Sequence, residues 1–246
     1  MSDLIKTRAI VLRKLDYGDT SRIIHLFTED FGKISAILKG GRSGKSKKIM
    51  LVDVMNNVQI VLYKKETREI QIISEVDLLQ HYPNISDDFD RMMHASAIIE
   101  LLLNLTVENE NNHRLYIGTA RALELINNRD KNPKLIFAKY FLFFIKEIGY
   151  EFPVTHCSIC GKELTSDVLS VAYNFESGIL CGDCKQDRLI HSELSKELFN
   201  LLFCLSTKKN DIVYEERNLV VIIKLLEKFL RYNIHEFKGL KSLELV

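Results

Sequence analysis

The sequence contains few of the residues that break a chain into flexible pieces, because only three of its 246 residues are proline. It has no low-complexity tract and no internal repeat. Hydrophobic residues make up 46% of the chain and charged residues 27%, which is ordinary for a globular protein. These features exclude a disordered chain, a repeat array and long flexible linkers. The length fits one large domain or two of ordinary size.

A segment for crossing or entering a membrane is also missing. The first residues do not form the long apolar core and small-residue cleavage site of a signal peptide. The longest apolar stretch, Phe137 to Ile148, is interrupted by Lys139 and Lys146 and falls short of the roughly 20 apolar residues that span a bilayer. We therefore expect a cytoplasmic protein with no membrane partner.

Catalytic motifs are absent as well. The chain has neither the G-x-S-x-G motif of a hydrolase nucleophile nor the H-E-x-x-H motif of a zinc protease. Its carboxylates occur in surface runs such as Asp87-Asp88. We expect a protein that is not an enzyme.

Charge is distributed unevenly, although the formal net charge is only +1. Residues 1–80 contain 14 Lys and Arg against 10 Asp and Glu, a net of +4. Residues 81–246 contain 20 against 23, a net of −3. A positive excess confined to one part of a chain indicates a module that binds a polyanion.

The first 80 residues alternate apolar and polar side chains with the period of a β-strand. Turn signals at Tyr17-Gly18-Asp19 and Asp30-Phe31-Gly32 separate the strands. Five short strands favour a small closed or partly closed β-barrel, of which the OB-fold is the commonest kind, although alternation by itself does not select it. The expected strands are Ile5–Leu15, Ser21–Thr28, Lys33–Lys39, a segment within Met50–Tyr63, and Glu69–Val76.

From Ser86 onward the apolar residues recur with the period of a helix. Pro133 suits the start of the third helix, and Gly149 suits its C-terminal cap. Ser192 and Glu193 suit the start of the fourth, with a hydroxyl cap and an early acid. The expected helices lie around Ile98–Leu105 and at Leu115–Ile126, Leu135–Ile148, Ser192–Leu205 and Asn218–Phe237.

Four cysteines form two C-x-x-C pairs, which are separated by 20 residues that include an expected β-hairpin. Two such pairs at this spacing close a tetrahedral shell of four sulfurs around one structural Zn²⁺. A closed shell leaves no position for a bound water, so the expected zinc is not catalytic. The expected ligands are Cys157, Cys160, Cys181 and Cys184.

The alternatives for these cysteines are redox C-x-x-C motifs or thiols without a metal. A redox motif would favour a thioredoxin-like βαβ setting, which the sequence lacks. His156, beside the first cysteine, is a conceivable substitute ligand, but four thiolates already fill the shell. Cys204 lies in an apolar run and is expected to be a buried core thiol.

The sequence therefore predicts an α+β protein. Residues 1–80 are expected to form a small five-stranded β-barrel that binds a polyanion. Residues 81–246 are expected to form an all-helical domain, which carries a four-cysteine zinc insert at residues 155–188.

A loop at Lys39–Lys48 has five positive charges, three glycines and no acid. Its Gly44-Lys45-Ser46 imitates the end of a nucleotide-binding P-loop, but the required G-x-x-x-x-G-K-[ST] is not met, because Lys39 stands where the first glycine is needed. A P-loop-like nucleotide hydrolase is thus an alternative that the spacing disfavours.

A polyanion-binding loop fits the same residues better, because mobile lysines neutralise phosphates without demanding fixed geometry. A solvated loop that binds nothing is equally compatible with the loop alone. A zinc-ribbon protein that only scaffolds other proteins is a further alternative. The expected nucleic-acid contacts are Lys39, Arg42, Lys45, Lys47 and Lys48.

The last expected helix carries a row of basic residues at Lys224, Lys228, Arg231 and His235. The simpler explanation is a solvated helix face. The functional alternative is a groove for phosphates or for an acidic peptide with an apolar end. Lys224, Lys228 and Arg231 are therefore a possible stripe for a partner or for DNA.

An ordered set of motifs resembles the bacterial RecO family of DNA repair and recombination proteins. It comprises Thr7–Leu12, Tyr17-Gly18-Asp19, Leu26-Phe27-Thr28 with Gly32-Lys33, Lys39–Arg42 with Lys45-Ser46, both cysteine pairs, and Leu240–Leu243. The set spans the chain and is similar to zinc-bearing members. Asp19 stands where Glu is common in the family, and Gly41 where Ala is common.

The resemblance implies that residues 1–80 form an OB-fold that binds DNA and that a helical C-terminal domain follows it. It also implies a non-enzymatic, nucleoid-associated role. Such proteins bind single- and double-stranded DNA and anneal complementary strands. With RecR they help load RecA onto DNA coated by single-stranded-DNA-binding protein (SSB), and they engage the acidic C-terminal tail of SSB. Bases would stack on exposed aromatic residues, for which the candidates are Tyr17, Phe31 and Tyr63.

Overall fold

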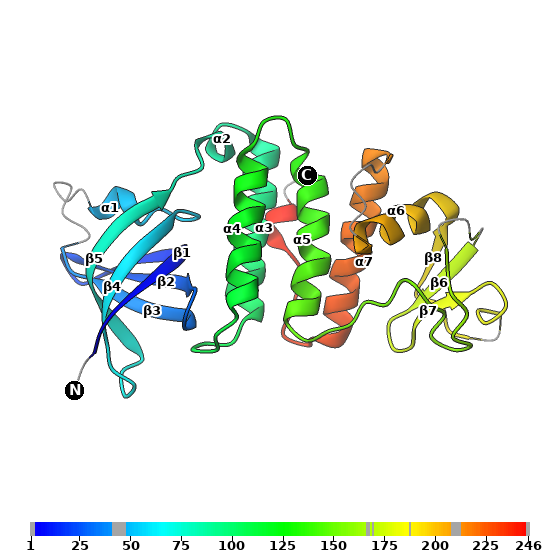
Figure 1. The fold of residues 1–246 in the computed structure, drawn as a ribbon, viewed down its shortest axis with the longest axis horizontal. Coiled ribbons are helices and arrows are strands. Elements are labelled where there is room, and N and C mark those ends of the chain that lie inside the picture. The colour runs from blue at the N-terminus through cyan, green and yellow to red at the C-terminus, as the bar shows by residue number, and fades with distance from the viewer. Residues whose placement is uncertain are drawn as a thin grey trace. The chain divides into compact units, whose positions relative to one another are not determined.

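The computed structural model describes residues 3–40, 48–165, 168, 170–186, 188–207 and 213–244 (Figure 1). The chain divides into two compact units, each considered by itself. The first unit comprises Met1–Pro133 with Ser242–Val246, and the second comprises Lys134–Lys241. In the described part of the chain, no helix combines the length and the apolar character that a membrane crossing requires.

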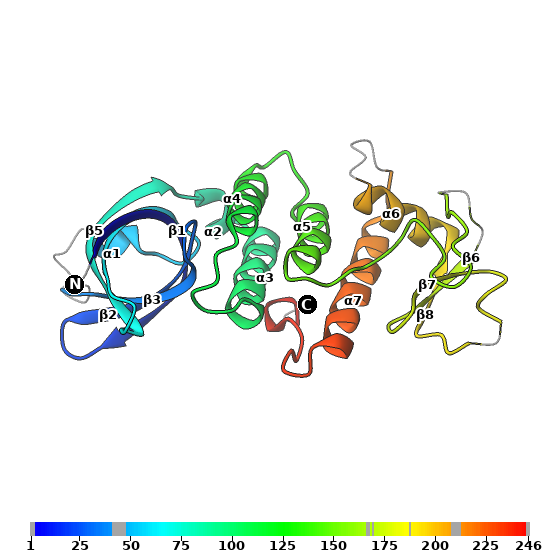
Figure 2. The same ribbon diagram turned by 60° about the horizontal axis from the view of Figure 1, so that its bottom comes forward.

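The first unit begins with a closed five-stranded barrel, whose strands surround a common centre in Figure 2. The strand order is β1-β2-β3-β5-β4, and β4 pairs back onto β1. Only β3 and β5 are parallel; the other pairs are antiparallel. The strands are β1 (Asp3–Tyr17), β2 (Ser21–Thr28), β3 (Gly32–Leu38), β4 (Asn57–Lys64) and β5 (Ile70–Gln80). The predicted OB-like barrel is thereby confirmed.

Alternate residues of every strand fill the barrel, as the period-2 pattern requires. The buried core is made of small and β-branched side chains with a few leucines, including Ala36, Val58 and Ile60 at 0–2% exposure. Burying such side chains stabilises the fold by roughly 1.5–3 kcal/mol for each Val, Leu or Ile. The chain between β3 and β4 includes one short helix, α1 (Lys48–Leu51).

The strand expected within Met50–Tyr63 starts later than its apolar residues suggest, at Asn57. Met55 has a positive φ of 75°, which ends any regular element. Its N–H donates to the carbonyl of Val11, and the carbonyl of Asn56 accepts from the Val11 N–H. Val11 begins the β-bulge of β1, so the turn before β4 supplies hydrogen bonds at this irregularity.

Three helices follow the barrel in the same unit: α2 (Pro83–Ser86), α3 (Phe89–Leu105) and α4 (His113–Asn127). The side chain of Asp88 caps α3 by accepting from Arg91 N, and that of Asn112 caps α4 by accepting from Leu115 N. The buried Arg91 guanidinium donates to the Ile126 carbonyl in the last turn of α4 and to three carbonyls beyond it, which satisfies both the charge and the helix terminus.

Close contacts join these helices to the barrel. A Cβ on Gly32 would lie 1.8 Å from the Glu110 carbonyl oxygen, so only glycine allows this approach. The Lys33 ammonium donates to the Leu103 carbonyl at 2.8 Å, and Tyr116 donates to Asn57 at the same distance. The first unit therefore extends beyond β5, and the boundary predicted at residue 80 marks the change from strands to helices.

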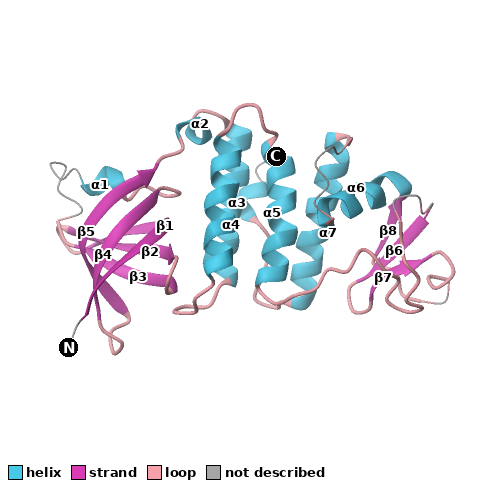
Figure 3. Ribbon diagram, viewed as in Figure 1, coloured by secondary structure: helices cyan, strands magenta, loops and turns pink. Residues whose placement is uncertain are grey.

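The second unit contains α5 (Pro133–Glu147), a three-stranded sheet and two further helices, distinguished by colour in Figure 3. The sheet order is β7-β6-β8, with β6 (Ser170–Asn174) in the centre. Its edges are β7 (Gly178–Cys181) and β8 (Ser192–Ser195). The helices are α6 (Lys196–Ser206) and α7 (Glu216–Asn233). A 3-10 turn, η1 (Lys241–Leu243), follows where the chain passes to the last residues of the first unit.

The helix expected to begin at Ser192 begins at Lys196 instead. Residues 192–195 pair with β6, because the central strand would otherwise leave its backbone groups unpaired on that edge. Ser195, not Ser192, caps α6 by accepting from Leu198 N at 3.4 Å. Local capping signals did not reveal this longer-range strand pairing.

An aromatic cluster forms much of the second unit's interior. Phe152 stacks on Tyr173 of β6 with ring centres 4.4 Å apart, and Phe229 of α7 meets Phe152 edge-on at 5.0 Å. Such pairs contribute about 0.5–1.5 kcal/mol beyond the area they bury. The cluster fixes the small sheet against α7.

Candidate metal centre and nucleic-acid interface

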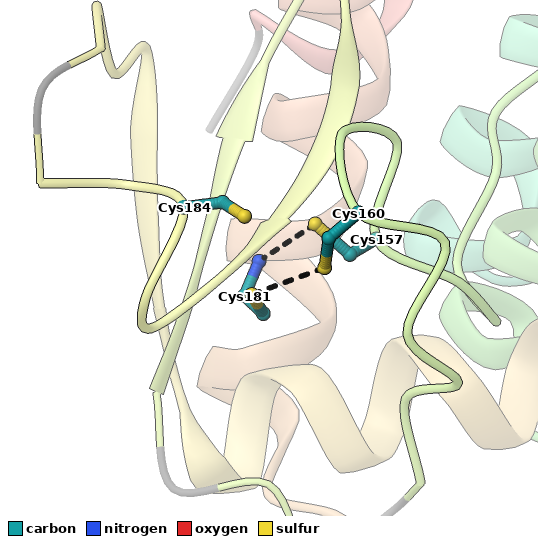
Figure 4. A group of neighbouring side chains, drawn as sticks. All are labelled: Cys157, Cys160, Cys181 and Cys184. Atoms are coloured by element: carbon teal, nitrogen blue, oxygen red, sulfur yellow. Dashed lines mark hydrogen bonds between the residues drawn. The ribbon is translucent and has the colours of Figure 1, made fainter.

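The four predicted cysteines converge on one point of the second unit (Figure 4). Cys157 and Cys160 lie in a tight loop before β6, Cys181 ends β7, and Cys184 lies in the turn that follows. Two backbone hydrogen bonds build the first turn, from Gly161 N to the Cys157 carbonyl and from Cys157 N to the Lys162 carbonyl. A third, from Ser158 N to the Ile179 carbonyl, joins that turn to β7.

The sulfur positions match a tetrahedral metal site. All four Sγ atoms lie within 4.8 Å of one another, and those of Cys160 and Cys181 are 3.8 Å apart. Zinc–sulfur bonds of about 2.3 Å in a tetrahedron require sulfur separations of roughly 3.8 Å. The four cysteines are therefore positioned to bind a metal ion, and thiolate chemistry is compatible with zinc.

The pKa values of two of the thiols are shifted in opposite directions. Burial acts to raise the pKa of Cys157, but N–H groups of Cys160, Cys181 and Ile159 outweigh it and lower the pKa to about 6. Hydrogen bonds with the Cys181 and Cys160 sulfurs raise the pKa of Cys184 to about 12. Four thiolates at these distances repel one another unless a cation balances them.

Two other predictions near the cysteines have different outcomes. His156 is exposed, its Nδ1 lies 3.0 Å from Thr155 Oγ1, and it is not part of the metal-ligand group found among the described residues. Cys204 was expected in the core, but it is partly exposed on α6, where its thiol contacts Asn200 Oδ1 at 3.5 Å. The apolar run around Cys204 buries only one face of the helix.

Of the predicted loop contacts, the structure describes the side chain of Lys39 alone, and it is exposed. Arg42, Lys45 and Lys47 lie outside the described residues. Lys48 is the first residue of the single-turn helix α1, and the description of Lys48 stops at its backbone. The assignment of this loop to DNA stays a prediction.

The predicted stripe on α7 lies on the exposed face of that helix. Lys224, Lys228 and Arg231 are exposed, whereas the leucines and Phe229 between them are buried. Within the described chain, none of the three basic residues forms an ion pair. The apolar neighbours on the exposed face are Val221 and Tyr232, at 43% and 41% exposure.

The three candidate stacking residues separate into two kinds. Tyr17 and Tyr63 are 55% and 43% exposed on the barrel. Phe31 is partly buried and packs against the barrel core, with the Lys64 ammonium 4.8 Å from its ring centre. Phe31 therefore contributes to the packing of the barrel, whereas Tyr17 and Tyr63 expose ring surface that a ligand could contact.

Two exposed cations of the barrel were not singled out from the sequence. Lys6 and Arg13 stand at outward-facing positions of β1 and form no ion pair with any residue of the described ranges. The alternation of the strand contained a signal for them, because Lys6 follows the apolar Ile5 and Arg13 follows the apolar Leu12. With Lys39, they place positive charge on the barrel wall itself.

The fold and the sites define a class of protein: an OB-like barrel with exposed cations, followed by helices and a cysteine-based metal centre. A family model described as "Recombination protein O N terminal" matches residues 1–82, and one described as "Recombination protein O C terminal" matches residues 86–244. The chain belongs to the RecO family of DNA repair and recombination proteins.

Curated relatives with the name "DNA repair protein RecO" support this membership. The protein of Chlorobium limicola is 36% identical over 163 residues, which cover 66% of this chain and 62% of that protein. The relative from Chloroherpeton thalassium is 28% identical over 98% of this chain and 96% of its own length. The relative from Syntrophomonas wolfei is 30% identical over 92% of this chain and 88% of its own length.

Proposed function

We propose that this protein is a recombination mediator, which binds single- and double-stranded DNA and anneals complementary strands. With RecR it would help load RecA onto single-stranded DNA coated by SSB. The observation that carries the proposal is family membership over nearly the whole chain, joined to a closed barrel with unpaired cations. No covalent step is required, so the proposal assigns no catalytic residue.

The barrel suits the physics of annealing. Two complementary strands repel each other through their phosphates, and cations such as Lys39 and the neighbouring loop residues reduce that repulsion without reading sequence. Exposed tyrosines add contacts that every base can make. An annealing protein needs this tolerance, because the strands that it joins have no fixed sequence.

The metal centre has a structural role in this proposal. Zn²⁺ held by Cys157, Cys160, Cys181 and Cys184 would supply a cross-link between the two ends of the insert. The site is made entirely of sulfur ligands, which leaves no position for substrate.

The stripe at Lys224, Lys228 and Arg231 is proposed as the contact for the acidic tail of SSB. Its charges are exposed and unpaired within the described chain, and Val221 and Tyr232 provide apolar surface on the same face. A tail with carboxylates and an apolar end would find both groups along a single helix face.

A strand-annealing assay on SSB-coated complementary oligonucleotides tests the proposal. Wild-type protein should accelerate annealing, and replacing Arg42, Lys45, Lys47 and Lys48 by Ala should reduce that acceleration. A variant with Cys204→Ser, which removes the one cysteine outside the metal cluster, serves as the control and should anneal normally. Wild-type protein that gives no acceleration over SSB-coated DNA alone would refute the proposal.

A further inference from the structure

The strand register places six apolar side chains in one continuous row around the outside of the barrel. Each member lies directly opposite the next on the neighbouring strand. The pairs are Leu4 with Tyr63, Tyr63 with Ile72, Ile72 with Ile37, Ile37 with Ile23, and Ile23 with Leu15. We call this row the apolar belt.

The four central members of the belt face outward, because each has a neighbour along the chain that faces the core. Leu62, Ile73 and Ala36 precede or follow belt members, and they are 0–4% exposed. Directly opposed residues of paired strands point to the same face of a sheet, so the alternation carries around all five strands. Leu4 is 63% exposed, Tyr63 43% and Leu15 37%, and the three isoleucines are of intermediate exposure.

The belt has cations on both sides. Outward-facing positions recur every second residue along a strand, which places Lys6 on one flank and Arg13 on the other. Lys39, one residue past the end of β3, continues the flank of Lys6. Lys6, Arg13 and Lys39 are exposed and make no ion pair within the described chain. Glu75, opposite Val61, is the one carboxylate among the flanking positions of the described strands.

An apolar row between unpaired cations fits one chemical class of ligand, a single-stranded nucleic acid. Its unpaired bases offer flat apolar faces, and its phosphates lie to the side of them. A duplex offers phosphates too, but its bases are stacked inside. The belt members stand on strands about 4.8 Å apart, which suits a single strand extended beyond the roughly 3.4 Å rise of duplex DNA.

We propose that bases of a bound single strand lie along the apolar belt, while Lys6, Arg13 and Lys39 contact its phosphates. The inference rests on the proposed DNA-binding function and adds the surface, its residues and a preference for unpaired bases. The belt and the charged loop then differ in kind: the belt supplies salt-independent contact with bases, and the loop supplies salt-dependent contact with phosphates.

A tryptophan reporter tests the inference in the intact protein. The chain has no tryptophan, so Tyr63→Trp introduces a single emitter on the belt, and Phe89→Trp introduces one at the start of α3 as the control. Titration with oligothymidylate should quench the belt reporter, saturating at the same concentration as the anisotropy of a labelled oligonucleotide. The control reporter should change little.

Matched triple variants give a second readout. Leu4→Ser, Leu15→Ser and Tyr63→Ser together should weaken oligothymidylate binding about tenfold or more, with an unchanged slope of log affinity against log salt, and should alter duplex binding much less. The control triple Phe89→Ser, Val107→Ser and Ile117→Ser removes apolar side chains of similar exposure from α3, α4 and the loop between them, and it should bind normally. Thermal melting checks that both triples are folded.

The outcomes distinguish a failure of the belt assignment from a failure of the proposed DNA-binding function. If wild-type protein binds oligothymidylate but the belt triple binds equally well and the belt reporter is not quenched, the belt is wrong and the DNA-binding function stands. The same conclusion follows if both triples lose affinity alike. If wild-type protein binds no DNA at all, the proposed function fails, and the belt assignment fails with it.

Discussion

The barrel and the cysteine-bearing insert achieve a closed structure by different means. The barrel closes through backbone pairing, since β4 returns to β1 and no sheet edge remains among its strands. The insert contributes β6 and β7 to a sheet of three short strands with two open edges, and its two cysteine pairs meet at four sulfurs. The barrel therefore closes through its own backbone pairing, whereas we expect the insert to depend on a metal ion held by its cysteines.

Removing the metal should produce the largest difference in stability between the two regions. Structural zinc contributes an apparent 10–16 kcal/mol in isolated zinc-finger peptides, so its loss exceeds what a sheet this small can supply. We expect Cys181→Ser to abolish the zinc content of about one per chain and to speed hydrogen exchange across β6–β8. Exchange in β1–β5 should stay slow.

The chain supplies its own control for that variant, because Cys204→Ser leaves the cluster intact. It should retain zinc and the slow exchange of the insert. Zinc-free wild-type protein with a fully protected insert would contradict the dependence on metal.

The barrel unit can be weakened independently through one glycine. Gly32 has φ +65°, and a Cβ there would overlap the Glu110 carbonyl, so Gly32→Ala should cost about 2–4 kcal/mol in the free energy of unfolding. Gly18 has φ +58° but open space around it, and Gly18→Ala should cost about 1 kcal/mol. Denaturant unfolding of the two variants measures the difference, and equal costs would show that the contact with Glu110 contributes little.

The basic stripe on α7 allows the comparison to be extended to the binding of a protein partner. Replacing Lys224, Lys228 and Arg231 by Ala should reduce binding of a synthetic peptide with the SSB tail's acidic, apolar-ended chemistry about tenfold. Each exposed charge contributes modestly, and together they provide the electrostatic attraction. Calorimetry with the peptide measures the reduction. Unaltered peptide binding would remove the stripe from the proposal.

The smallest expected effect concerns pH. Burial lowers the pKa of His25, and the nearby Arg13 lowers it further, so the folded state favours the neutral imidazole. Because the unfolded chain then binds more protons, His25 should reduce stability as pH falls below the ordinary value of about 6.5. His25→Gln should flatten the pH dependence of the melting temperature between pH 5 and 7. The accompanying change in stability should be smaller than that of either glycine substitution. His235→Gln, on exposed α7, is the control; identical profiles for both variants would exclude a role for His25.

The features that could be predicted from the sequence are those that local patterns encode. The two cysteine pairs specify the metal cluster because their ligands are close along the chain, and the alternation of residues 1–80 specifies strands. Features that depend on pairing between distant segments could not be predicted in this way. The strand at residues 192–195 required knowledge of β6, the late start of β4 required the bulge at Val11, and the apolar belt exists only once the register of five strands is known. Cys204 was misplaced because an apolar run does not say which helix face is buried.

The central claim is that the barrel, and not the second unit, holds single-stranded DNA. Anisotropy of a labelled oligothymidylate over a range of salt concentrations tests it with two variants of similar charge change. Alanine at Arg42, Lys45, Lys47 and Lys48 should lower the affinity and shrink the salt slope by about 0.7 for each phosphate that is no longer neutralised, whereas alanine at Lys224, Lys228 and Arg231 should leave both nearly unchanged. A loop variant that binds like wild type, beside a stripe variant with reduced affinity and slope, would contradict the account.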